Sequence, residues 1–204
     1  FDACHSIGRK VNKNDLYFLA DIIIHSFYAT KIITCGHGGL IWSKNKNSID
    51  FCKDFINFDL RKKYKKRFNF LITDFQVSLL FEQLKNLEKI RRFRNNTFKK
   101  YKSAVKGKIK IFSNFDLRND IVYRAVLIFN SFKEKQTFKN KLAKNGVESI
   151  TPIENFELLH NYKNLDKKNF SVSESISKRT LSLPLYLSLK KYEINKICKL
   201  LNSY

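Results

Sequence analysis

The spacing of apolar residues predicts two short strands followed by a helix in the first third of the chain. Residues 22–27 and 40–42 are apolar runs, and Gly36, Gly38 and Gly39 lie between them. This order is typical of a strand, a turn and a second strand, because glycine adopts backbone angles that other residues avoid. Residues 48–62 then have a broad apolar face at helical spacing.

A long helix is predicted to begin at Thr73. Thr73 and Gln76 have the spacing of a capping box, and apolar residues recur every three or four positions as far as Ile90. We expect this helix to continue to about residue 101.

The second half of the chain alternates between segments with strand and helix patterns. The expected strands are residues 108–112 and 121–129, and the expected helices are residues 133–144 and 190–202. Gly146 is placed to end the first of these helices. Residues 155–172 have the composition of a loop. The pattern predicts an α/β fold with two domains, residues 1–102 and 103–204.

Length and composition indicate a part of a larger protein. The chain has 204 residues, contains no methionine and begins with Phe1. We expect it to be the C-terminal part of a longer protein.

No stretch approaches the roughly 20 apolar residues of a membrane helix, and no signal peptide is visible, so the cytoplasm is the expected location. The four cysteines lack the spacing of a zinc site or a disulfide framework, and we interpret them as free thiols: Cys4, Cys35, Cys52 and Cys198.

The formal charge of +22 raises nucleic acid as a partner, because clustered Lys and Arg neutralise phosphates. Apart from residues 61–67 and 91–102, however, the basic residues are spread along the whole chain. A nucleic-acid-binding module is therefore the last of three hypotheses, and we expect neither nucleic acid nor membrane as a partner.

One lysine and one acid have the arrangement that a pyridoxal phosphate enzyme needs. Lys31 follows an apolar strand at the start of a glycine-rich turn, and Asp2 lies upstream. In such enzymes a lysine amine forms a Schiff base with the cofactor, and a carboxylate keeps the pyridine nitrogen protonated. Lys31 and Asp2 are the candidates for these roles.

Five motifs in order resemble the DegT-type sugar aminotransferases. They are DACHSIG (residues 2–8), HSFYATK (25–31), GHGGLIW (36–42), FNFLITDFQ (68–76) and TLSLPLY (180–186). Enzymes of this family have fold type I and use pyridoxal phosphate to aminate nucleotide-linked keto sugars. The resemblance implies part of the sheet of the large domain, followed by a small C-terminal α/β domain.

The resemblance also implies a role for each of five residues. Lys31 matches the catalytic lysine that binds the cofactor and moves protons, and Asp2 matches the partner of the pyridine nitrogen. His5 matches a residue near the phenolic oxygen, and Ser26 a hydroxyl that binds the phosphate. Asn69 matches an amide that reaches the phosphate in the neighbouring subunit, so a homodimer with shared sites is expected.

The resemblance implies a reaction as well. Glutamate is the expected amino donor, and Lys31 favours transamination, since related dehydratases carry histidine at this position. Three positions depart from the family pattern: Leu71 replaces an arginine, His37 replaces a glutamate, and Glu154 lies where a histidine is common after Pro152. A second hypothesis is therefore a truncated, inactive remnant of the same family.

Overall fold

The computed structural model describes residues 1–11, 16–107 and 109–204. The helices are α1 (Leu16–Leu19), α2 (Lys46–Ile56), α3 (Asp74–Lys85), α4 (Leu87–Ala104), α5 (Phe132–Lys144), α6 (Leu159–Tyr162), α7 (Ser171–Arg179) and α8 (Lys191–Asn202), with short 3-10 helices η1 (Asn155–Glu157) and η2 (Lys167–Phe170). The strands are β1 (Ile22–Ser26), β2 (Gly39–Ser43), β3 (Lys110–Ile111), β4 (Ala125–Ile128) and β5 (Thr180–Leu183). None of the described helices is both long and apolar enough to cross a membrane.

The described residues form two compact units. The first contains Phe1–Arg91 and Asp116–Tyr123, and the second contains Arg92–Phe115 and Arg124–Tyr204. The units divide inside α4, earlier along the chain than the expected domain boundary near residue 103. The assignment of domains 1–102 and 103–204 stays a prediction, because compact units within one chain do not establish independent folding.

In the first unit, β1 and β2 pair antiparallel, with Ile24 opposite Ile41. Both predicted strands are confirmed. The start of the chain lies along the opposite edge of β1, where Asp2 forms a parallel bridge with Ile24 and the Ala3 N–H donates to the Ile24 carbonyl at 2.8 Å. This pairing places Asp2 beside the strand that leads to Lys31.

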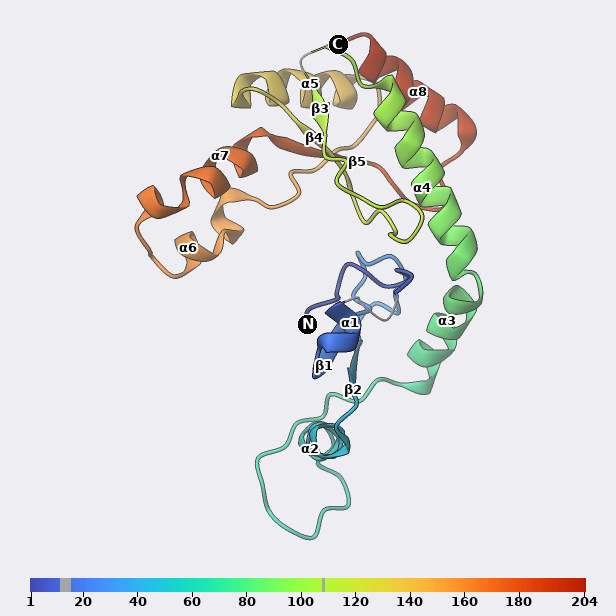
Figure 1. Ribbon diagram of the computed structural model, residues 1–204, viewed down its shortest axis with the longest axis vertical. Helices are drawn as coiled ribbons and strands as arrows, with labels where there is room; N and C mark the ends of the chain where they lie inside the picture. Colours follow the sequence, from blue (N-terminus) through green and yellow to red (C-terminus); the bar gives the residue numbers. More distant parts are fainter. Residues whose placement is uncertain (12–15, 108) are drawn as a thin grey trace. The chain divides into compact units, whose positions relative to one another are not determined.

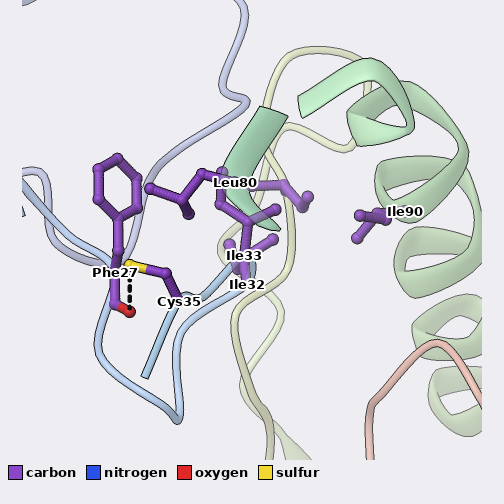
Figure 2. Packing of buried hydrophobic residues seen from close by; sticks show 7 residues of the cluster. Phe27, Ile32, Ile33, Cys35, Leu80 and Ile90 are labelled. Carbon is purple, nitrogen blue, oxygen red and sulfur yellow. Dashed lines mark hydrogen bonds between the residues drawn. The ribbon is translucent and has the colours of Figure 1, made fainter. Parts of the chain in front are cut away.

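The core of the first unit gathers around the residues that follow Lys31 (Figure 2). Its buried members are Phe27, Ile32, Ile33, Cys35, Leu80, Ile90 and Ile121. The Cys35 thiol contacts the Phe27 carbonyl at 4.0 Å, as the dashed line in Figure 2 marks. Burial of a side chain such as Ile33 contributes about 1.5–3 kcal/mol, so this cluster holds the end of the turn firmly.

The helix predicted between residues 48 and 62 is confirmed only as far as Ile56, where α2 ends. The Asn45 side chain caps its first turn by accepting the Asn47 N–H at 2.9 Å. Beyond α2 the basic segment 61–67 is tied back to the helix, because the Arg67 guanidinium contacts Asp54 at 2.9 Å. The helix prediction is wrong for residues 57–62, whose chain turns instead to make this contact.

The single helix predicted from Thr73 to about residue 101 is two helices, α3 and α4. The capping box is confirmed, because Thr73 and Gln76 each accept the other's backbone N–H, at 3.3 and 3.1 Å. At Asn86 the side-chain amide donates to the Glu82 carbonyl at 2.9 Å. A short polar side chain that bonds the backbone in this way competes with regular helix, so the prediction is wrong at Asn86.

The second unit contains the antiparallel sheet β3-β4-β5, with Val126 opposite Ser182. The strand predicted at 108–112 is confirmed for Lys110–Ile111, whereas Lys108 lies outside the described residues. The strand predicted at 121–129 begins only at Ala125. β5, which apolar spacing alone does not predict, follows α7 directly (Figure 1).

The two helices predicted at 133–144 and 190–202 are confirmed as α5 and α8. Gly146 follows α5 with a positive φ of 68°, as expected for a glycine that ends a helix. The Lys141 ammonium donates to the Ser203 carbonyl at 3.0 Å, which joins the C-terminal ends of α5 and α8. The inward face of α8 consists of Ile194, Ile197 and Leu201.

The segment 155–172, expected to be a loop, consists mainly of η1, α6 and η2. Glu174 in α7 holds this segment in place, because its carboxylate accepts hydrogen bonds from Asn155 at 2.8 Å and from His160 at 2.9 Å. His160 is buried and stacks on Phe170, with ring centroids 4.5 Å apart. The loop prediction is wrong because these polar contacts over long sequence separation have no local signal.

The Glu174 network predicts an acid-sensitive second unit. Hydrogen bonds from His160 and Asn155 lower the pKa of Glu174 from 4.5 to about 2. A carboxyl group whose pKa is depressed by folding stabilises the folded state above its unfolded pKa and loses that contribution as the pH falls through its folded pKa. We expect Glu174→Gln to lower the free energy of unfolding at pH 7, and the difference from the unsubstituted protein to shrink between pH 4.5 and 2. Urea unfolding at several pH values measures this, with exposed Glu148→Gln as the control; a difference independent of pH would contradict it.

Candidate active site

Lys31 lies where the chain turns from β1 into the core of the first unit. Its backbone N–H donates to the Tyr28 carbonyl at 2.9 Å and closes the turn, and the next two residues, Ile32 and Ile33, are buried. The Lys31 side chain is half-buried. The turn therefore fixes the backbone of Lys31 while its amine stays accessible.

Helix α3 holds the residues after Lys31 through two glutamine side chains. Gln83 accepts the Thr34 N–H at 3.0 Å and donates to the Thr34 carbonyl at 2.6 Å. Gln76 donates to the His37 carbonyl at 3.1 Å. These bonds satisfy backbone N–H and C=O groups of a segment that is neither helix nor strand and so lacks regular backbone hydrogen bonds.

Gln83→Leu is expected to destabilise the protein by about 1–3 kcal/mol, because Thr34 loses both backbone partners at once. The matched control on the same helix is Glu82→Gln, which removes only an exposed ion pair with Lys85. Urea unfolding of the two variants measures the difference. Equal stabilities would show that Gln83 does not support this turn.

Asp2 is exposed, and the Cys4 N–H donates to its Oδ1 at 2.9 Å. Hydrogen bonds from the Cys4 side chain and backbone lower the pKa of Asp2, and the nearby charges of His5 and Lys31 lower it further. Asp2 therefore carries a negative charge near neutral pH, within electrostatic range of Lys31. On β1, His25 Nδ1 lies 3.0 Å from the Ala3 carbonyl, and burial lowers the pKa of this histidine, which favours its neutral form.

His5 stacks on Tyr123, with ring centroids 3.9 Å apart and an interplanar angle of 15°. The Lys31 Nζ atom lies over the same Tyr123 ring, 5.6 Å from its centroid. Because both contacts use one ring, His5 and Lys31 are neighbours in the first unit. The sequence pattern does not indicate that Tyr123 belongs to the site. It falls within a predicted strand, where an aromatic residue is ordinarily part of the core.

Ser26 ends β1, and its Oγ accepts the Tyr28 N–H at 3.3 Å. This bond supports the turn that carries Lys31. A hydroxyl group can accept and donate at the same time, so the contact is compatible with donation to a phosphate.

Asn69 lies in a different place from the other four candidates. It lines a pocket of about 420 Å³ that includes none of Asp2, His5, Ser26 or Lys31. The lining residues come from the loop after α2 and the segment before α3: Asn57, Phe58, Asp59, Leu60, Arg61, Asn69 and Leu71. The structure thus brings Asp2, His5 and Lys31 together, places Ser26 at the base of the same turn, and sets Asn69 apart.

The three departures from the family pattern occupy three different surroundings. Leu71 shares the pocket of Asn69, where Arg61 supplies a cationic side chain. His37 contributes its backbone carbonyl to the Gln76 bond in the glycine-rich turn. Glu154 precedes η1 in the second unit, and its N–H donates to the Glu157 carboxylate at 2.7 Å.

Two named proteins are similar in sequence to this chain. GDP-perosamine synthase of Vibrio cholerae is 24% identical over 212 residues, an alignment that covers 100% of this chain and 58% of that protein. UDP-4-amino-4,6-dideoxy-N-acetyl-beta-L-altrosamine transaminase of Campylobacter jejuni is 30% identical over 123 residues, covering 52% of this chain and 33% of that protein. The chain thus spans little more than half the length of the first relative.

A solved structure has the same fold. The PLP-form of Spr1654 from Streptococcus pneumoniae superposes with a TM-score of 0.83 at 22% identity, covering 99% of this chain and 56% of that one. The pattern of the DegT/DnrJ/EryC1/StrS aminotransferase family matches residues 1–202. With nearly the whole chain matched, this protein belongs to the DegT/DnrJ/EryC1/StrS aminotransferase family.

Proposed function

We propose that this chain is part of a pyridoxal phosphate-dependent aminotransferase that acts on nucleotide-linked keto sugars. The observation that carries the proposal is the shared contact of His5 and Lys31 with the Tyr123 ring, beside the pairing of Asp2 with β1, in a chain of this family. The names of the relatives support the substrate class, since one is a GDP-perosamine synthase and another a UDP-linked amino-sugar transaminase. Glutamate as donor rests on the family resemblance, and the cytoplasm is the proposed location.

The residues near Lys31 fit the cofactor. Pyridoxal phosphate supplies an aldehyde that reacts with amines and a protonated ring that withdraws electrons from a substrate carbon. Lys31 Nζ is the amine that would hold it, on a side chain that is half-buried. Asp2, whose pKa is lowered by its Cys4 hydrogen bonds, is ionised near neutral pH and would pair with the positive charge of the ring nitrogen.

The remaining candidates orient the cofactor and move protons. His5 would lie near the phenolic oxygen, and Ser26 would donate to the phosphate. When not bound to the cofactor, Lys31 Nζ would take a proton from one carbon and return it to another. A lysine suits this task because its amine remains tethered within reach of both atoms.

The separate position of Asn69 supports a homodimer in which each site uses residues from two subunits. We propose that Asn69 reaches the cofactor phosphate of the neighbouring subunit. Mixing Lys31→Ala and Asn69→Ala proteins tests this, since a shared site predicts activity in the hybrid dimer from one intact site. Hybrids as inactive as the Lys31→Ala parent would contradict the sharing of sites.

The reaction is tested with the full-length protein that contains this chain. Incubation with pyridoxal phosphate, glutamate and a GDP- or UDP-linked 4-keto sugar is expected to yield 2-oxoglutarate and amino sugar in equal amounts. Loss of a hydroxyl group from the sugar without 2-oxoglutarate would indicate a dehydratase instead.

The alternative is a remnant that holds no cofactor, and it is favoured by Leu71, which stands where the family pattern has an arginine. Titration of the 204-residue chain with pyridoxal phosphate separates the two. Tight binding of one cofactor per chain would contradict the remnant hypothesis, and no binding to the full-length protein would contradict the enzyme.

A further inference from the structure

Tyr123 reaches the candidate site from a distant part of the sequence. It ends the segment Asp116–Tyr123, which belongs to the first unit although the residues on both sides of it belong to the second. Contacts that attach this segment to the first unit include Lys10 N–H to the Asn119 carbonyl at 2.8 Å, Arg9 Nε to Asp120 at 3.3 Å, and Arg91 to the Arg118 carbonyl at 3.1 Å. The position of Tyr123 relative to Lys31 is therefore fixed by several independent bonds.

The contacts of the Tyr123 side chain converge on the residues proposed to hold the cofactor. One ring stacks on His5 at 3.9 Å and lies 5.6 Å from Lys31 Nζ. The hydroxyl group donates to the carbonyl of Thr30, the residue before Lys31, at 3.3 Å. Tyr123 also packs against the core cluster of the first unit. The side chain thus contacts His5, the backbone next to Lys31, and the Lys31 amine.

These contacts differ from those of an ordinary core tyrosine. A tyrosine that only fills the core contacts apolar side chains, whereas here the two named ring partners are an imidazole and an ammonium group. A stacked imidazole loses rotational freedom, and an ammonium group over an aromatic face is attracted to it. The ring therefore restricts the orientations of His5 and of the Lys31 amine together.

We propose that Tyr123 is a positioning residue that aligns Lys31 and His5 for the cofactor. The inference rests on the proposed function. In that function Lys31 Nζ holds the cofactor and moves a proton, and Tyr123 would set the position of Lys31 Nζ for both tasks. The ring carries the effect, and the hydroxyl group contributes through Thr30.

The test compares three variants of the full-length protein loaded with pyridoxal phosphate. Tyr123→Leu removes the ring, Tyr123→Phe keeps the ring without the hydroxyl group, and Tyr64→Leu replaces a fully exposed tyrosine elsewhere in the first unit as the control. The first measurement is the rate at which hydroxylamine removes the cofactor, followed by loss of its visible absorbance. The second is kcat and KM for the keto sugar.

Tyr123→Leu is expected to release the cofactor about tenfold faster and to lower kcat about tenfold, with KM changed less than about threefold, because misplacement of a reacting group acts on the chemical step. Tyr123→Phe is expected to remain within about threefold of the unsubstituted protein in both measurements, since the ring contacts persist. Tyr64→Leu is expected to change neither quantity.

If Tyr123→Leu releases the cofactor at the same rate and has the same kcat as the unsubstituted protein, the inference is overturned while the proposed function stands. Absence of cofactor absorbance in the unsubstituted protein would overturn both. If Tyr123→Leu fails to fold, Tyr123→Met takes its place, since its unbranched, flexible side chain adapts to the space left by the ring, and the same outcomes decide.

Discussion

Lys31→Ala is expected to abolish visible absorbance from bound cofactor and to lower kcat by at least about 10³-fold, because it removes both the proposed covalent anchor and the proposed proton carrier. The fold should persist, since the Lys31 side chain is half-buried and its backbone makes the turn through a main-chain bond to Tyr28. Absorbance spectra and steady-state rates of the full-length protein measure both effects.

The matched control is Lys196→Ala, which removes an exposed lysine of α8 and should change neither quantity. Added methylamine should restore part of the kcat of Lys31→Ala, because a free amine can carry the proton that the lysine no longer moves. A variant with unchanged spectrum and rate would exclude Lys31 as the anchor.

Asp2→Asn is expected to lower kcat about 10²-fold or more while the fold is kept, because the substitution removes only the charge that we propose sustains a protonated cofactor ring. The asparagine oxygen can still accept the Cys4 N–H that Asp2 Oδ1 accepts at 2.9 Å. Any loss of rate is then due to charge and not to a broken turn.

The control for Asp2→Asn is Asp21→Asn, an exposed acid just before β1. It makes the same chemical change next to the same strand and should leave kcat within about twofold. An Asp2→Asn protein with normal kcat and a normal cofactor spectrum would contradict the role of Asp2 at the ring nitrogen.

The features that the sequence predicts best are those set by neighbouring residues. The apolar run at β1, the capping box of Thr73 and Gln76, and Gly146 after α5 each depend on side chains a few positions apart. Such patterns fix local backbone conformation before any tertiary contact forms. Asp2 and Lys31 are candidates for a related reason, because the apolar strand and the glycine-rich turn near Lys31 are local patterns, whereas Ser26 is a candidate only through the family resemblance.

The features that the sequence does not predict depend on contacts between distant segments. Tyr123 meets His5 and Lys31 only because its segment returns to the first unit. Gln83 supports Thr34 across 49 positions, and His160 and Glu174 order a segment with a loop composition. The spacing of residues along the chain does not reveal which distant residues meet in space. Only the structure therefore identifies the residues that support the candidate site.

The proposed attachment of the cofactor to Lys31 is tested most directly by trapping it. Borohydride reduction of the loaded full-length protein makes the bond permanent, and peptide mass analysis then locates the modified residue. The account predicts one modified peptide per chain, with the cofactor on Lys31 and none in Lys31→Ala. Cofactor trapped on another lysine, or none trapped while the protein is active, would contradict it.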